Sequence, residues 1–234
     1  VLLLPVACLF GKQVVGYGLV FVHLCKNIVL GCIGLHYLRL FGFSCSVCIV
    51  ASYVLSFCGY VMVTGQHYEY ATYAVTYCFM ILMCEKTIRE KKWRAGLLFS
   101  VCLLGLLGPY ASFWPLVSGG VYCVIRVLQI CQGRDFGSFF RQILFLACYM
   151  TLGLLLSMFA FLPQCYEIFF VSSRMQQEQT AVSILKEAFG LIPGEYLKSG
   201  FFRLFSNHLQ GLINSWEGPK AYFSATPYYF SLFF

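Results

Sequence analysis

The sequence predicts an all-α protein that crosses a membrane several times, and three observations support this fold class. Hydrophobic residues make up 60% of the 234 positions and charged residues only 11%, whereas soluble domains hold roughly 25% charged residues. The mean hydropathy is +0.77. The apolar residues lie in long stretches separated by short polar connections, as expected for a polytopic helix bundle.

The apolar stretches can be taken in chain order, because a spanning helix needs roughly 17 to 25 apolar residues. The first six residues lack the basic flank of a signal peptide, so the opening stretch is interpreted as the end of a span. The expected spans cover residues 1–10, 14–38, 44–64, 68–84, 95–108, 115–128 and 142–162. Short apolar stretches also form re-entrant hairpins, so residues 95–128 are either two spans or one such hairpin.

The character of the chain changes after the seventh stretch. Residues 163–220 mix charged and apolar positions, and Ser172 or Ser173 is suited to cap a helix there. Two amphipathic helices on the outer membrane surface, or over the mouth of the bundle, satisfy this pattern. Residues 221–234 look like the start of a further span, and the chain begins with Val, so an internal fragment of a longer protein is expected.

The basic residues predict the orientation of the bundle. The connection at residues 85–94 carries five Lys or Arg residues, and the loop at residues 65–69 carries none. Basic loops stay on the cytoplasmic side, so residues 65–69, 108–115 and 163–220 are expected outside the cytoplasm. Topology also explains the net charge of +7 better than a nucleic-acid partner does, and no such partner is expected.

Cysteine and metal-binding patterns predict no cofactor site. Most of the 13 Cys residues lie in apolar stretches, where Cys serves as a small packing residue. Cys45 and Cys48 have C-x-x-C spacing, but no second pair or His cluster accompanies them. No metal site and no nucleotide-binding signature is predicted.

Lys26 lies near the midpoint of the expected span at residues 14–38, with His23 one turn earlier. A charge at that depth usually faces the bundle interior and marks a functional site. Lys26 is therefore a candidate anchor for an anionic lipid phosphate or a partner for a buried carboxylate. The alternative is a Lys that snorkels to the interface or is hydrogen-bonded internally.

Further candidate residues lie in the segments expected outside. Gln66, His67 and Glu69 suit sugar hydroxyls, and His67 with Glu69 suits a proton relay, although an ordinary interfacial loop has the same residue types. Ser173 and Arg174 suit a phosphate, and the alternative is a helix cap beside a surface charge.

An ordered series of short motifs resembles the bacterial YfhO-type membrane proteins. The series begins at residues 57–60 and 65–67, continues with Glu85 and its basic connection, and reaches the Gly108-Pro109-Tyr110 turn. It then runs through residues 162–163 and 172–174 to residues 216–222, and so covers nearly the whole chain. Each motif is weak alone, and their ordered succession carries the resemblance.

The resemblance implies a GT-C-type glycosyltransferase of the bacterial cell membrane. Such an enzyme takes a sugar from a polyprenyl-phosphate carrier and attaches it outside the membrane, here to an envelope polymer such as lipoteichoic acid. The catalytic carboxylate of that fold class is expected in a loop before Val1, and no cofactor is assigned. Lys26, Gln66, His67, Glu69, Tyr110, Ser173 and Arg174 would then contact membrane lipid, lipid-linked sugar or acceptor.

Two other classes remain open from the sequence. The intramembrane pair His23 and Lys26 also suits a transporter or flippase of lipid-linked saccharide, because buried charges often mark a translocation path. A non-catalytic membrane protein of the cell envelope is the third possibility.

Overall fold

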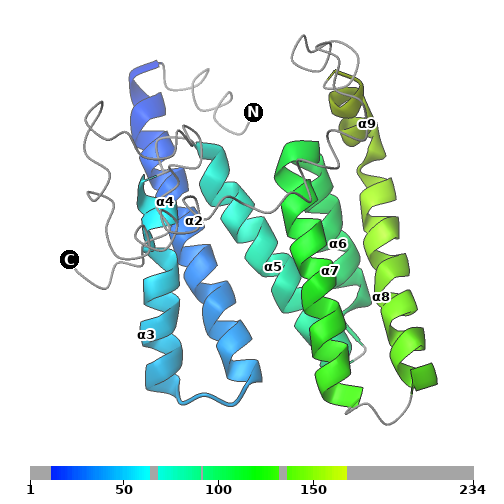
Figure 1. Cartoon of the computed structure of the whole chain (residues 1–234). Coiled ribbons are helices and arrows are strands. Elements are labelled where there is room, and N and C mark those ends of the chain that lie inside the picture. The colour runs from blue at the N-terminus through cyan, green and yellow to red at the C-terminus, as the bar shows by residue number, and fades with distance from the viewer. Residues whose placement is uncertain (1–11, 64–67, 91, 132–135, 168–234) are drawn as a thin grey trace, which may run out of the picture. The chain divides into compact units, whose positions relative to one another are not determined.

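The computed structural model describes residues 12–63, 68–90, 92–131 and 136–167. All the regular elements in these ranges are helical, and none of the described residues forms a strand (Figure 1). The expected span at 1–10, the loop residues Gln66 and His67, and the expected amphipathic segment from residue 168 onward lie outside the described residues.

Four described helices are long and apolar enough to cross a membrane. They are Val15–Leu40, Cys45–Met62, Ala111–Cys131 and Phe136–Leu156, and the second is interrupted at residues 57 and 58. The all-α fold is thus confirmed for the described residues, and these helices are consistent with a multi-pass membrane protein.

The described residues divide into two compact units, one ending at Ala74 and the other beginning at Val75. The first contains an α-helical hairpin, α2 (Lys12–Leu40) and α3 (Cys45–Ser56), followed by the short helix α4 (Gly59–Val63). Gly42 turns the chain between α2 and α3 with φ +77°, a conformation that favours glycine. The two helices approach closely at Gly31, where an added Cβ would lie 2.6 Å from Ser56 Oγ.

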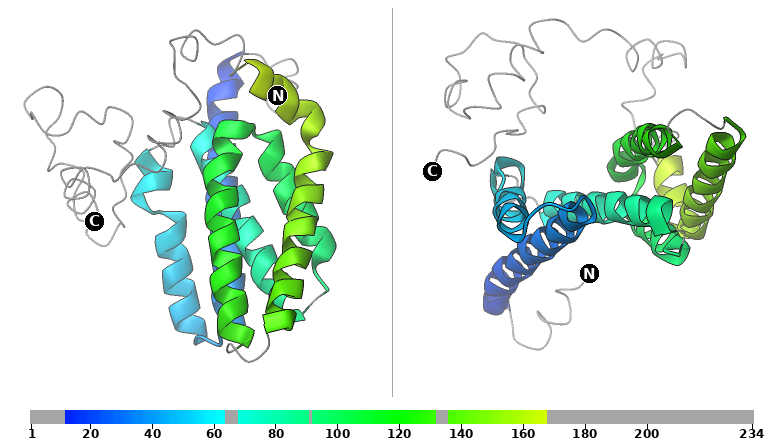
Figure 2. Two further views of the ribbon diagram at one scale, coloured as in Figure 1. Left: turned by 45° about the vertical axis from the view of Figure 1, so that its right-hand side comes forward. Right: turned by 90° about the horizontal axis from the view of Figure 1, so that it is seen from below.

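The second unit contains the later part of α5 (Tyr68–Glu90), α6 (Arg94–Leu106), α7 (Pro109–Cys131), α8 (Phe136–Leu156) and α9 (Met158–Tyr166). Figures 1 and 2 show α6, α7 and α8 side by side. Leu97, Val101 and Leu104 of α6 are fully buried. At Gly153 of α8 an added Cβ would lie 2.6 Å from the Leu98 carbonyl oxygen, so glycine permits the close approach of α6 and α8.

The structure differs from the sequence-based expectation between residues 108 and 115. The aromatic turn expected there is helical from Pro109 onward, and the break between helices is confined to the residues around Gly108. Gly108 has φ +99°, which suits the end of a helix, and Pro109 suits the first helical position because no N–H is needed there. Pro115 lies inside α7 and does not end it.

Two helices also differ in the length or polarity expected of a span. α5 is 23 residues long but is not among the four apolar helices, because its four Tyr residues and five charged residues lower its hydropathy. α6, with 13 residues, extends over about 20 Å at 1.5 Å per residue, less than the roughly 30 Å of a hydrocarbon core. α7 has 23 residues and is long enough.

α8 begins at Phe136, six residues before the expected 142, and a break at Ser157 separates it from α9.

Candidate functional site

The predicted site residues are only partly described by the structure. Gln66, His67, Ser173 and Arg174 lie outside the described residues. Glu69 is exposed in the first turn of α5 and accepts a hydrogen bond from the Tyr73 hydroxyl at 3.1 Å.

The other two candidates belong to different units. Tyr110 belongs to the first turn of α7 in the second unit, whereas Lys26 lies in α2 of the first unit and is partly buried.

A groove lies between α2 and α3, next to the predicted site residue Lys26 in the chain, because Asn27 lines it. It has a volume of about 220 Å³ and follows the facing sides of the two helices. Exposed side chains of Ile28, Ile49 and Tyr53 line it, so the groove is accessible from the flank of the helix pair. Both helices belong to apolar stretches long enough to span, so a hydrocarbon chain has access to this groove from the membrane.

Two residues that line this groove carry polar atoms without a hydrogen-bond partner in the described part of the chain. Asn27 and Ser52 are 4% and 5% exposed, and within the described residues neither Asn27 Oδ1 nor Ser52 Oγ has a hydrogen-bond partner. Ser56, which also lines the groove, donates its hydroxyl to the Ser52 carbonyl oxygen at 2.9 Å. An unsatisfied polar group at membrane depth costs several kcal/mol, so a ligand hydroxyl, which can donate to Asn27 Oδ1, would be favoured there.

Lys26 and His23 extend this polar region along α2. His23 precedes Lys26 by three positions and Asn27 by four, so the three residues lie along one side of the helix. His23 Nδ1 is buried and has no hydrogen-bond partner among the described residues. The cation expected from the sequence thus lies next to a buried amide and near a buried imidazole nitrogen.

A second polar cluster surrounds Glu85 in the second unit. Its carboxylate is completely buried and accepts four hydrogen bonds. Oε1 accepts from Arg89 Nε at 2.5 Å and from Arg126 Nη2 at 2.6 Å. Oε2 accepts from Arg126 Nε at 2.9 Å and from the Tyr122 hydroxyl at 2.6 Å. The bidentate contact joins α5 to α7, and Arg126 also donates to Gln129 Oε1.

The electrostatics of this cluster favour a structural role. Glu85 lies beyond the end of the expected span at 68–84 and in none of the four apolar helices. Burial raises the pKa of its carboxyl group, but hydrogen bonds from Arg126, Tyr122 and Arg89 outweigh that effect and lower the pKa to about 2. Both oxygens are occupied, and a group with so low a pKa is a poor general base near neutral pH. We therefore interpret Glu85 as an ionic clamp between α5 and α7.

Sequence reasoning identified Lys26 but missed the pairing of Glu85 with Arg126. The sequence analysis did not single out Arg126, which lies within the apolar helix Ala111–Cys131. The available signal was the spacing of Tyr122 and Arg126 by four positions on one side of an apolar helix. A cation so placed needs a buried acceptor.

Among the described residues, no group of three or more His, Cys, Asp and Glu side chains is arranged to hold a metal ion. The thiols of the C-x-x-C pair have separate partners, since Arg39 donates to Cys45 Sγ and Cys48 donates to the Phe43 carbonyl oxygen. Comparison of the chain with protein-family models, curated proteins and solved structures gives no match.

Proposed function

We propose that this protein is a membrane glycosyltransferase that moves a sugar from a polyprenyl-phosphate carrier to a cell-envelope polymer such as lipoteichoic acid on the outer face of a bacterial membrane. The motif series that resembles YfhO-type proteins motivates the proposal. The structural observation that supports it best is the α2–α3 groove. It combines apolar walls with polar atoms of Asn27 and Ser52 that have no hydrogen-bond partner among the described residues, and Lys26 precedes Asn27 in α2.

The groove and the residues next to it match the chemistry of a lipid-linked sugar in three respects. The apolar walls of the groove suit an isoprenoid chain. Lys26 does not line the groove but precedes Asn27 in α2, and a Lys ammonium suits a phosphate. Asn27 Oδ1 needs a donor and the Ser52 hydroxyl needs a partner, and sugar hydroxyls offer both functions. Ser56 lies at the end of α3 from which the chain continues toward Gln66 and His67, so in our proposal the sugar extends toward that loop.

The proposal is tested with the full-length protein in proteoliposomes, supplied with a radiolabelled polyprenyl-phosphate sugar and lipoteichoic acid. We expect label in the polymer. Lys26→Met should lower transfer about tenfold or more, because a hydrogen bond to a charged group contributes about 1.5–3 kcal/mol. Gln66→Ala and Arg174→Ala should also lower it.

Lys92→Met is the matched control, since Lys92 is an exposed cation in the connection between α5 and α6. Its transfer rate should equal that of the unmodified protein. If no sugar reaches any envelope polymer, or if Lys26→Met transfers sugar at the control rate, the proposal is wrong.

A second candidate function is a transporter or flippase of lipid-linked saccharide. Interrupted helices favour it, because α3 ends at Ser56 before α4 begins at Gly59, and α8 ends at Leu156 before α9 begins at Met158. In the same proteoliposomes, movement of labelled lipid between leaflets without labelled polymer would identify this function and exclude the transferase.

A further inference from the structure

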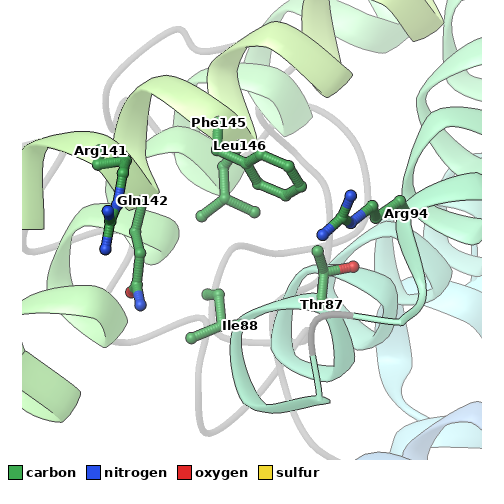
Figure 3. A pocket seen from close by; sticks show the side chains of 7 residues that line it. All are labelled: Thr87, Ile88, Arg94, Arg141, Gln142, Phe145 and Leu146. Carbon is green, nitrogen blue, oxygen red and sulfur yellow. The ribbon is translucent and has the colours of Figure 1, made fainter. Parts of the chain in front are cut away.

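A cavity in the second unit lies among the ends of three helices. It has a volume of about 210 Å³ and lies between the last turn of α5, the first residue of α6 and the early turns of α8. Figure 3 shows Arg94 on one side of this cavity and Arg141 with Gln142 on the other. Among the described residues that line it, none is acidic.

The side chains around this cavity are positioned for an anion. The guanidinium of Arg94 lies over the Phe145 ring, 4.7 Å from its centroid, which holds it beside α8. Thr87 donates its hydroxyl to the Met83 carbonyl oxygen at 2.7 Å, so the helix itself satisfies that polar group. Two guanidinium groups from different helices can grip the oxygens of one phosphate from two sides.

Gln142 provides an independent indication of a ligand. Its Oε1 is buried and has no hydrogen-bond partner among the described residues. A half-turn of the amide exchanges this oxygen for the NH2 group, which would present donors to an anion. With the amide so turned, its NH2 group at the wall of a cavity with two Arg residues would donate to a bound oxyanion.

The location of the cavity favours a lipid source for that oxyanion. Arg141 lies one and a half turns into α8, which is apolar and long enough to span, so its guanidinium would lie near one membrane surface. Phe140 and Leu144 of α8 are 60% and 55% exposed and offer an apolar flank beside the cavity. Basic pockets between spanning helices bind anionic headgroups.

We propose that Arg94, Arg141 and Gln142 form a binding site for a phosphate-bearing anion, filled by the headgroup of an anionic phospholipid whose chains lie along α8. The site is separate from the α2–α3 groove and does not depend on glycosyl transfer. It would bind lipid on the side of the membrane to which the basic connection at residues 85–94 belongs.

The test is native mass spectrometry of the full-length protein titrated separately with phosphatidylglycerol, phosphatidylcholine and inorganic phosphate. We expect phosphatidylglycerol to bind and phosphatidylcholine to bind at least tenfold more weakly. Arg94→Gln/Arg141→Gln should weaken phosphatidylglycerol binding about 30-fold, since each basic residue near an anionic headgroup contributes about fivefold. Because Arg141 is exposed, Arg141→Gln alone should fold and should weaken binding about fivefold.

Arg39→Gln/Lys92→Gln removes the same charge from other basic positions and should change binding less than twofold. If this control weakens binding as much as the cavity double variant, the effect is general surface charge and the proposal is wrong. It is equally wrong if Arg94→Gln/Arg141→Gln and Arg141→Gln bind like the unmodified protein. Binding of inorganic phosphate that is lost in the cavity variants, without binding of phosphatidylglycerol, would support the site and overturn its lipid source.

Discussion

Glu85 shows how one buried carboxylate can hold two helices together. Four donors from Arg89, Tyr122 and Arg126 surround it, and two of them come from one guanidinium in bidentate geometry. Burial alone would penalise the charge, so the clamp is stable only while all partners remain. The cluster therefore holds α5 beside α7, because the buried carboxylate of Glu85 on α5 needs the guanidinium of Arg126 on α7 as its partner.

Removal of Arg126 is expected to destabilise the protein strongly. Arg126→Met leaves the buried carboxylate without its bidentate partner, and the loss of one member of a buried ion pair costs about 3–5 kcal/mol. The stability of Arg126→Lys should lie between that of the unmodified protein and that of Arg126→Met, because a single ammonium cannot reproduce both contacts. Thermal unfolding in detergent measures the effect, with Lys92→Met as an exposed control that should not change the unfolding temperature.

Acid should weaken the same clamp. The Glu85 pKa is about 2 in the folded protein and about 4.3 in an unfolded chain, so its ionised form stabilises the fold above about pH 4.3. That contribution is lost as the pH falls from about 4.3 to 2. The unfolding temperature of the unmodified protein should therefore exceed that of Glu85→Gln by a constant amount above pH 5 and approach it toward pH 2. A difference that is unchanged down to pH 2 would contradict this assignment.

At the scale of helices, glycine determines how closely α6 and α8 pack. Gly153→Ala places a Cβ 2.6 Å from the Leu98 backbone oxygen and 2.9 Å from Val101 Cβ. A backbone atom cannot move aside cheaply, so overpacking should cost about 1–3 kcal/mol. The lowered unfolding temperature of this variant measures that cost.

Gly120 offers a matched control within α7. A Cβ added there has no heavy atom within 4 Å, so Gly120→Ala adds the same methyl group in open space. Alanine favours a helix over glycine by about 1 kcal/mol, so this variant should be as stable as the unmodified protein or more so. Equal effects of the two substitutions would show that α6 and α8 do not pack at Gly153 as described.

The helix boundaries show what sequence reasoning could and could not find. Apolar length alone predicted helical segments and the break near Gly108. Its expected spans ended at residue 108 and resumed at residue 115, whereas Pro109 begins α7 and Pro115 lies within it. Whether proline ends a helix depends on where the missing N–H falls, and composition does not show that position.

At the scale of the whole molecule, the all-α class could be predicted from the low charge content and the long apolar stretches. A long apolar stretch indicates a lipid surrounding, and in lipid a helix satisfies its own backbone hydrogen bonds. Candidate sites were harder to predict. Lys26 stood out as a lone charge in an apolar stretch. The groove beside it is formed by Asn27 of α2 and Ser52 of α3, and only packing brings α3 beside α2. The partnership of Glu85 with Arg126, 41 positions apart, depends on packing in the same way.

Orientation is a prediction for the whole molecule. Because five cations lie at residues 85–94 and none lies at residues 65–69, the first segment should face the cytoplasm and the second the outside. Epitope tags inserted after Lys92 and after Gln66 of the full-length protein measure this in intact cells. Only the second tag should be accessible to antibody, and accessibility of the tag after Lys92 would reverse the orientation.

The central claim is that a lipid-linked phosphate binds in the α2–α3 groove, and photocrosslinking with a diazirine-bearing polyprenyl phosphate tests it most directly. We expect labelled peptides from α2 and α3 of the full-length protein. Ile49→Trp should lower labelling at least tenfold, because Ile49 lines the groove, whereas Val50→Trp adds the same ring at an exposed neighbour that does not line it. Label distributed over other helices, or equal labelling of the two variants, would contradict the account.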